Sequence, residues 1–243
     1  MSPINASFDN GILRITLADP SSGNLLSNDM LGSILTAMEQ WNRAGVLVLA
    51  SEGPNFSVGR PRPRTSSGLD GADANRVRHA LEMVHALNMK LRNWPGASMA
   101  VLRGQARGAA AGFIANCDVV VAETGASLAF PEITYDLPPA LVASYLPNRI
   151  SPRIAQYLLL SGAEIDVNRA LAWGIVHEVH SPDNIVNKAN ALIEFLASRA
   201  PGAIDHCKRA LQAFQNQAHE AAGPVAIDLV LEWLCRGEAK EQS

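Results

Sequence analysis

The sequence predicts an α/β fold for the first part of the chain, with parallel strands and helices packed outside them, followed by a helical region. Short apolar runs typical of buried strands alternate with stretches whose apolar residues recur at helical spacing, and glycine-rich turns follow two of the strands. This alternation is typical of parallel strands joined by crossover helices. From about residue 138 the pattern is mainly helical. We therefore expect a core unit over residues 1–180 and a C-terminal helical region over residues 181–243.

The N-terminal segment is expected to form a β-hairpin and then a helix. Asn10 and Gly11 supply the positive φ angles of a tight turn between Phe8 and an apolar run at residues 12–17. Asn28 is a suitable cap for the following helix, because Asn side chains accept hydrogen bonds from the first helical amides. The apolar stripe of this helix consists of Met30, Leu31, Ile34, Leu35 and Met38.

The following elements repeat a strand, a turn and a helix. Four apolar runs predict strands at residues 46–50, 98–102, 119–122 and 127–130. A loop rich in Pro, Arg, Ser and Gly covers residues 53–71, and residues 104–112 form a Gly- and Ala-rich turn that enters a helix. Another amphipathic helix lies between these two segments and is marked by Val77, Leu81, Val84, Leu87 and Leu91. A short apolar segment at residues 175–179 and a helix break at residues 200–202 divide the helical region.

Composition excludes several classes of protein. Of the 243 residues, 48% are hydrophobic and 18% charged, which indicates a folded globular chain rather than a disordered one. The net charge of −3 supplies no positive field for nucleic acid. No apolar segment approaches the ~20 residues needed to cross a bilayer. The three cysteines are dispersed and no histidine spacing indicates a metal site, so we expect a reducing, cytoplasmic location without a metal.

Two glycine turns carry the first functional indication. Residues 55–61 and residues 103–112 each follow a predicted strand, and their small residues let a ligand approach the backbone N–H groups. Two such turns can direct two N–H groups at one oxygen. Donors in this arrangement stabilise the negative charge that develops on a carbonyl when its α-carbon loses a proton, and each contributes ~3 kcal/mol. The pattern suits a thioester enolate.

Several motifs give these turns a family context. They are Asp19-Pro20, Asn24-Leu25-Leu26-Ser27, Phe56-Ser57-Val58-Gly59, the segment at residues 104–118, Phe130-Pro131-Glu132-Ile133, Leu160-Ser161-Gly162 and Ala172-Trp173-Gly174-Ile175-Val176. In these motifs and their order the chain resembles the crotonase (enoyl-CoA hydratase/isomerase) superfamily. The resemblance implies a crotonase-like spiral of β-β-α units with a C-terminal helical trimerisation region. It also implies a homotrimer or a dimer of trimers, assembled through residues 155–179.

The resemblance implies an acyl-CoA thioester as substrate, with CoA entering as part of that substrate and no separate cofactor. The backbone N–H groups of Arg60 and Ala109 match the oxyanion hole for the thioester carbonyl. Val58 falls where the backbone of the family contacts the adenine of CoA. Arg62 and Arg64 are placed to reach the CoA phosphates through charge-assisted hydrogen bonds, although a solvated loop face explains both arginines equally well.

Glu132 is the expected acid/base residue. It follows a strand-like apolar segment, where burial can raise the proton affinity of a carboxylate, and it matches the catalytic glutamate of the family. The second glutamate of the family's hydratases is replaced by Gly112. A single glutamate can still move a proton between two carbons, so the resemblance favours an isomerase over a two-glutamate hydratase. Asp136 is a weaker catalytic candidate, because Asp at a turn before Pro138 commonly bonds local backbone.

Two alternatives remain open from the sequence. The same oxyanion hole would serve a hydrolase of the family that cleaves a thioester, or the C–C bond of a β-diketone, with water held by Glu132 or Asp136. The departures from the family pattern at Gly112 and Ala109 would also fit a paralogue that binds CoA without turnover and acts as a scaffold.

Overall fold

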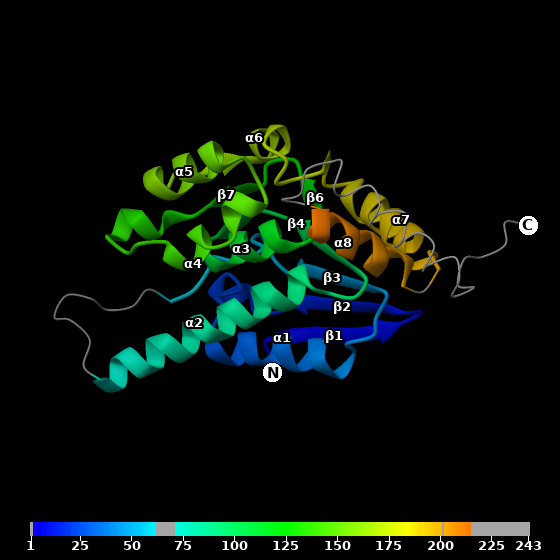
Figure 1. Cartoon of the computed structure of the whole chain (residues 1–243), viewed down its shortest axis with the longest axis horizontal. Helices are drawn as coiled ribbons and strands as arrows, with labels where there is room; N and C mark the ends of the chain where they lie inside the picture. Colours follow the sequence, from blue (N-terminus) through cyan, green and yellow to red (C-terminus); the bar gives the residue numbers. More distant parts are fainter. Residues whose placement is uncertain (1, 62–70, 201, 215–243) are drawn as a thin grey trace, which may run out of the picture.

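The central feature of the computed structural model is a six-stranded sheet with helices on both faces (Figure 1). The structure describes residues 2–61, 71–200 and 202–214. The strand order is β1-β2-β3-β4-β6-β9, in which only the β1–β2 pair is antiparallel. The strands are β1 (Ile4–Asp9), β2 (Ile12–Leu17), β3 (Val46–Ser51), β4 (Ala97–Leu102), β6 (Val119–Glu123) and β9 (Glu178–His180). The predicted α/β class with a largely parallel sheet is confirmed.

The predicted hairpin forms at the edge of this sheet. Asn10 and Gly11 have φ angles of 50° and 76°, and Asp9 pairs directly with Ile12. β2 then pairs in parallel with β3, so the hairpin is joined to the rest of the sheet.

Alternate residues of the central strands face two separate cores, because successive side chains of a strand point to opposite faces. Leu47 and Leu49 of β3 belong to the larger core, and Val46 and Val48 belong to the smaller one. The larger core is covered by α1 (Asn28–Gln40), α2 (Gly71–Arg92) and α3 (Ala109–Asn116), and the smaller core is covered by α7 (Ile185–Ala197).

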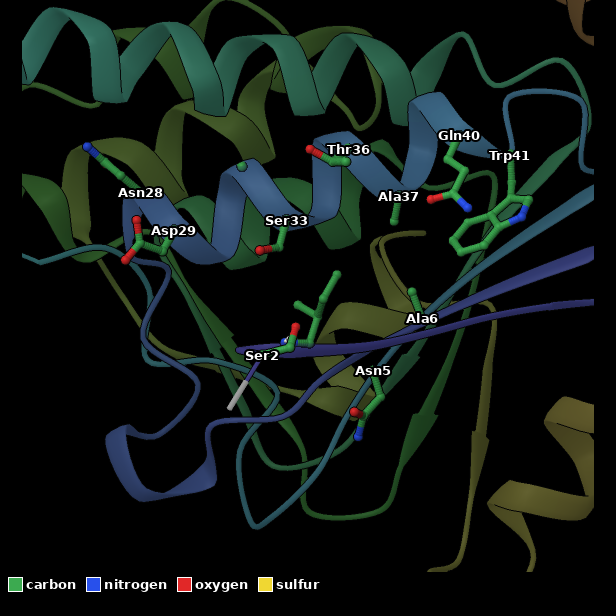
Figure 2. Close-up of a pocket in the computed structure, with 12 residues that line it drawn as sticks. Ser2, Asn5, Ala6, Asn28, Asp29, Ser33, Thr36, Ala37, Gln40 and Trp41 are labelled. Carbon is green, nitrogen blue, oxygen red and sulfur yellow. Dashed lines mark hydrogen bonds between the residues drawn. The ribbon is translucent and has the colours of Figure 1, made fainter.

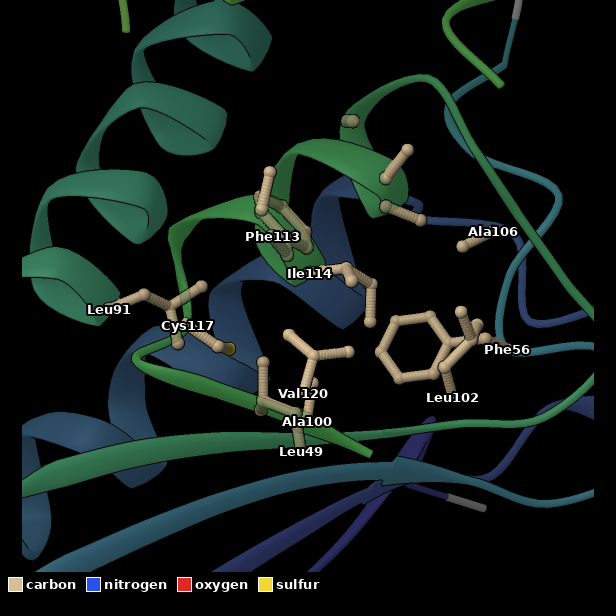
Figure 3. Close-up of a cluster of buried hydrophobic side chains, with 14 of the residues drawn as sticks. Leu49, Phe56, Leu91, Ala100, Leu102, Ala106, Phe113, Ile114, Cys117 and Val120 are labelled. Carbon is tan, nitrogen blue, oxygen red and sulfur yellow. The ribbon is translucent and has the colours of Figure 1, made fainter. Parts of the chain in front are cut away.

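Helix α3 is buried along its whole length. Figure 3 shows Phe113 and Ile114 of α3 lying over Ala100 and Val120 of the sheet. This packing holds α3 against the sheet, and the predicted second oxyanion turn leads directly into this helix.

A smaller three-stranded sheet extends the spiral. Its order is β5-β7-β8, with β5 and β7 parallel and β7 and β8 antiparallel. The strands are β5 (Gln105–Arg107), β7 (Ser127–Ala129) and β8 (Ile165–Asp166). β8 lies in a stretch that the sequence predicts as helical, and it is extended because Ile165 pairs with Leu128 of β7.

The remaining helical elements come mainly from the second half of the chain, as predicted. They are η1 (Pro20–Ser22), η2 (Pro131–Tyr135), α4 (Ala140–Ala143), η3 (Leu146–Asn148), α5 (Pro152–Ser161), α6 (Val167–Ala172) and α8 (Ala203–Phe214). The division into units at residue 180 stays a prediction, since residues 215–243 lie outside the described part of the chain.

Hydrogen bonds set the ends of three elements and correct two of the predictions. Ser27, not Asn28, caps α1, because its Oγ accepts a hydrogen bond from the Met30 amide at 3.1 Å. The predicted turn at residues 104–112 includes strand β5, which pairs with β7. A strand occupies only the end of the apolar segment at residues 175–179, starting at Glu178, because the Ile175 amide still donates to the carbonyl of Ala170.

Helix α8 is tied to the sheet by one lysine. The Lys208 ammonium donates to the carboxylate of Asp118 at 2.7 Å and to the carbonyl oxygens of Trp94 and Gly96 at 2.8 and 3.1 Å. Trp94 and Gly96 precede β4, and Asp118 precedes β6. The lysine therefore connects α8 to the end of the sheet where both strands begin. None of the helices in the described ranges combines the length and apolarity needed to cross a bilayer.

Candidate active site

The first predicted oxyanion turn is held in place by Asn24. Its Oδ1 accepts a hydrogen bond from the Asp19 amide at 2.9 Å, and its Nδ2 donates to the carbonyl oxygens of Glu52 and Asn55 at 2.8 and 2.9 Å. The Ser57 hydroxyl donates to the Asn24 carbonyl at 2.7 Å. Asn24 and Ser57 are both fully buried, so this network fixes the chain just before the turn.

The two glycine turns lie side by side. The Ser57 amide donates to the Gln105 carbonyl at 3.0 Å, and the Arg107 amide donates to the Ser57 carbonyl at 3.1 Å. Gly59 has a φ angle of 90°, and a Cβ atom on it would lie 2.6 Å from the Arg107 carbonyl oxygen. Only glycine fits this close approach of two backbones.

The amides of Arg60 and Ala109 are left available by this arrangement. Neither amide donates a hydrogen bond to another described residue. Ala109 is the first residue of α3, where helix amides lack an internal partner. The turns therefore leave two N–H donors in adjacent segments without a partner among the described residues, and their joint role as an oxyanion hole stays a prediction.

Glu132 lies directly against the second turn. It belongs to η2, and its Oε1 atom lies 2.9 Å from the position that a Cβ atom on Gly108 would occupy. Its Oε2 atom is buried without a hydrogen-bond partner. Burial raises the pKa of the Glu132 carboxyl above its usual value. The structure thus brings a carboxylate of raised proton affinity beside the start of α3.

Gly112 lies one helical turn beyond Gly108, and the space beside it is filled by Tyr145. The Tyr145 hydroxyl oxygen lies 2.1 Å from the position of a Cβ atom on Gly112. Tyr145 is buried beside α3, between α4 and η3. Burial, followed by the nearby Glu132 carboxylate, raises the pKa of the phenol, and the Asn88 amide partly offsets this rise.

The remaining predicted site residues are Val58, Asp136, Arg62 and Arg64, and the structure describes the first two. Val58 lies in the first turn, and its amide donates to the Gly23 carbonyl at 3.0 Å. Asp136 is exposed at the end of η2 with a φ angle of 57°, and its amide donates to the Ile133 carbonyl at 3.1 Å. This is the geometry of a turn residue, and the catalytic role of Asp136 stays a prediction. Arg62 and Arg64 lie outside the described residues.

Three residues near Gly112 are not predicted by the sequence analysis. They are Asn88, Asn116 and Tyr145. Asn88 carried a signal that could have found it, because it lies on the apolar stripe of α2 between Leu87 and Leu91 and is 3% exposed. Tyr145 carried none, since only the packing after α4 places it against α3.

A surface hollow of about 810 Å³ lies elsewhere, between β1 and α1 (Figure 2). Its lining includes Asn5, Ser33, Thr36 and Trp41 and none of the predicted site residues. Among the described residues, no group of three or more His, Cys, Asp or Glu side chains is placed to hold a metal ion.

Comparisons with known proteins identify the family of this chain. The sequence profile of the enoyl-CoA hydratase/isomerase family matches residues 7–232. A protein of Thermus thermophilus named "Putative enoyl-CoA hydratase" is 30% identical over 210 residues, which cover 85% of this chain and 82% of the relative. The mitochondrial enoyl-CoA hydratase domain-containing protein 3 of Danio rerio is 27% identical over 236 residues, covering 95% of this chain and 80% of the relative. The chain therefore belongs to the enoyl-CoA hydratase/isomerase family.

The fold is shared with solved structures of this family. The crystal structure of human enoyl coenzyme A hydratase domain-containing protein 3 superimposes with a TM-score of 0.85 at 24% identity, covering 96% of this chain and 92% of that one. The predicted crotonase-like spiral is confirmed.

Proposed function

We propose that this protein moves a proton at the α-carbon of an acyl-CoA thioester, with Glu132 as the single acid/base group, and that it isomerises an enoyl-CoA. The observation that carries the proposal is the half-buried Glu132 carboxylate beside Gly108, whose Oε2 atom is buried without a partner, next to the available Ala109 amide. The family membership supports the substrate class.

The reaction follows from these positions. The thioester carbonyl oxygen binds the amides of Arg60 and Ala109, which stabilise the enolate that forms. Glu132 removes a proton from the α-carbon of a 3-enoyl thioester, and the electron pair of the broken C–H bond spreads over the carbonyl and the double bond. The same carboxyl returns the proton to the γ-carbon, which leaves a 2-enoyl thioester and regenerates the carboxylate.

Isomerisation is favoured over hydration because the site has no second carboxylate on α3. Hydration needs a group that takes a proton from water as it attacks. Gly112 has no side chain, and the Tyr145 phenol beside it is a poor base while it remains protonated.

The test is a screen of 3-enoyl and 2-enoyl-CoA thioesters, scored separately for isomers, water addition and free CoA. Glu132→Gln should lower isomer formation by 10²-fold or more, since a positioned acid/base contributes about 10²–10⁴-fold. Glu194→Gln is the matched control, because Glu194 is an exposed residue of α7, on the other face of the sheet. Asp136→Asn shows whether Asp136 contributes.

The alternatives give different products. Release of free CoA, or ring opening of a cyclic β-diketone, would show that the protein is a hydrolase of the family and not an isomerase. Tight CoA binding without any turnover would indicate a scaffold. Water addition by the wild type that survives in Glu132→Gln would contradict the assignment of Glu132.

We also propose a homotrimer or a dimer of trimers. Exposed apolar side chains gather on α5 and α6, at Tyr157, Leu160 and Leu171, which fits a surface covered by another subunit. A single monomer peak in light scattering at working concentration would overturn this. The cytoplasmic location stays a prediction, and the relative from Danio rerio is named as mitochondrial.

A further inference from the structure

The candidate site depends on where two neighbouring strands end. β5 ends at Arg107, directly before Gly108 and the Ala109 amide. β7 ends at Ala129, three residues before Glu132. The last residues of these parallel strands are paired, Arg107 with Ala129, and the Gly108 amide donates to the Ala129 carbonyl at 2.8 Å. The pairing of β5 and β7 therefore sets the position of the second glycine turn relative to Glu132.

One carboxylate, that of Glu164, connects these two strands. Its Oε1 atom accepts a hydrogen bond from the Ser127 hydroxyl of β7 at 2.6 Å, and its Oε2 atom accepts one from Arg107 Nη1 of β5 at 3.1 Å. Glu164 directly precedes β8, and the antiparallel register of β7 and β8, continued by one residue, places it opposite Ala129. The Arg107 side chain therefore reaches from β5 past β7 to the start of β8.

The contact lies on the outer face of the small sheet. Ala106 and Leu128, which neighbour Arg107 and Ser127 along their strands, are buried in the larger core, and successive residues of a strand point to opposite faces. The side chains of Arg107 and Glu164 are 29% and 42% exposed. An ion pair with this exposure contributes little to global stability. Its loss should therefore change the position of the strand ends more than the population of folded protein.

The backbone before Glu164 also contacts the element that carries Glu132. Gly162 has a φ angle of 63°, and a Cβ atom on it would lie 2.6 Å from Thr134 Cγ2 and 3.2 Å from Ile133 Cγ2, both in η2. The segment at residues 162–164 thus packs against η2 through its backbone and binds β5 through the Glu164 side chain. Both parts of the candidate site are held by this one segment.

We infer that Glu164 is a positioning residue, which acts through Arg107 to fix the second glycine turn relative to Glu132. Arg107 belongs to the contact between both turns, because its amide donates to the Ser57 carbonyl and its carbonyl oxygen lies against Gly59. This inference rests on the proposed function. Displaced amides would stabilise the enolate less, whereas the CoA part of the substrate would bind as before. Loss of the contact should therefore lower kcat and leave KM unchanged.

The first measurement is the steady-state isomerisation of a 3-enoyl-CoA. Glu164→Ala and Arg107→Met should each lower kcat roughly tenfold, which is less than the about 10²–10³-fold cost of losing a whole oxyanion donor, and should leave KM within about twofold. The double variant should lose no more than the worse single variant, because both changes break one contact. Arg209→Met is the control, since it breaks another exposed ion pair of 3.1 Å, with Asp205 of α8. It should leave both constants unchanged.

The second measurement needs no turnover. In 4-dimethylaminocinnamoyl-CoA an electron-donating group is conjugated to the thioester carbonyl, so hydrogen bonds to that oxygen move its absorbance to longer wavelength. Binding to the wild type should produce this red shift, and the shift should be smaller in Glu164→Ala and Arg107→Met. Glu164→Gln is the milder second variant, because Gln keeps an acceptor for Ser127 and removes the charge that binds Arg107. It should also reduce the red shift.

A full red shift and a wild-type kcat in Glu164→Gln or Arg107→Met would overturn the inference. A lower Tm with both readouts intact would do the same, since it would show a purely structural contact. Additive losses of kcat in the double variant, or no red shift with the wild type, would also contradict it. Failure of the proposed function would appear differently, as a wild type that makes no 2-enoyl product while the red shift and its dependence on Glu164 remained measurable.

Discussion

The hydroxyl of Tyr145 occupies the space that a side chain on Gly112 would need, with 2.1 Å between the phenol oxygen and the Cβ position. The side chain of one residue therefore fills the space beside another that lies 33 positions earlier in the chain. A phenol from a later element stands where the resemblance to hydratases would put a carboxylate.

This contact predicts a coupled pair of substitutions. Gly112→Ala should lower the free energy of unfolding by about 1–3 kcal/mol, because an overpacked core must shift. The cost should be smaller in the Tyr145→Phe background, where the nearest ring atom to the new Cβ is Cζ at 3.3 Å. Urea denaturation of both single variants and the double variant measures this coupling. Additive costs would show that the two residues do not compete for the space.

The raised pKa of Glu132 predicts a pH-dependent stability effect. The folded protein binds the Glu132 proton more tightly than the unfolded chain does, so ionisation of this carboxyl destabilises the fold. Stability is therefore lost as pH rises above the unfolded value near 4.5. Glu132→Gln should raise the Tm at pH 7, and this gain should shrink as the pH falls toward 4. A gain that is independent of pH would contradict the assignment.

The ionisation of Glu132 also predicts that activity decreases at acidic pH. The base form of Glu132 is the deprotonated one, so kcat/KM should fall as pH drops through the raised pKa. A profile of kcat/KM against pH locates this limb. An acid limb at or below 4.5 would mean that the carboxyl responsible is not a buried one.

Asn24 should contribute strongly to stability although it is not placed to touch substrate. Asn24→Ala removes three hydrogen bonds from a fully buried side chain and leaves their partners unpaired. We expect a loss of about 2–4 kcal/mol in the free energy of unfolding. Asn5→Ala is the control, because Asn5 makes one exposed hydrogen bond to Glu52, and it should stay within about 0.5 kcal/mol. Equal costs for the two variants would refute the anchoring role.

Lys208 should stabilise the docking of α8. Lys208→Met keeps much of the aliphatic length but leaves Asp118 and two carbonyl oxygens without their donor. The expected loss is about 1–3 kcal/mol. Lys90→Met breaks an exposed pair with Glu39 and should cost less than about 1 kcal/mol. Thermal unfolding of both variants separates a partly buried anchor from a surface ion pair.

The sequence by itself determined the class of fold and one half of the candidate site. The Asn10-Gly11 turn and the apolar runs follow from local backbone preferences and side-chain periodicity, and the structure contains the hairpin and strands β3, β4 and β6 where those patterns lie. The placement of Glu132 beside the glycine turns was accessible because motif order carries that information.

Tertiary structure alone decided the formation of β8 and the contact between Tyr145 and Gly112. The pairing of Ile165 with Leu128 made a strand in a stretch predicted as helical, because hydrogen bonds from a distant segment outweighed local preference. Tyr145 reached Gly112 only through the packing of the turns after α4 against α3. Spacing along the chain contains no signal for such a contact, because the side chain and the empty position it fills belong to elements that meet only in the folded molecule.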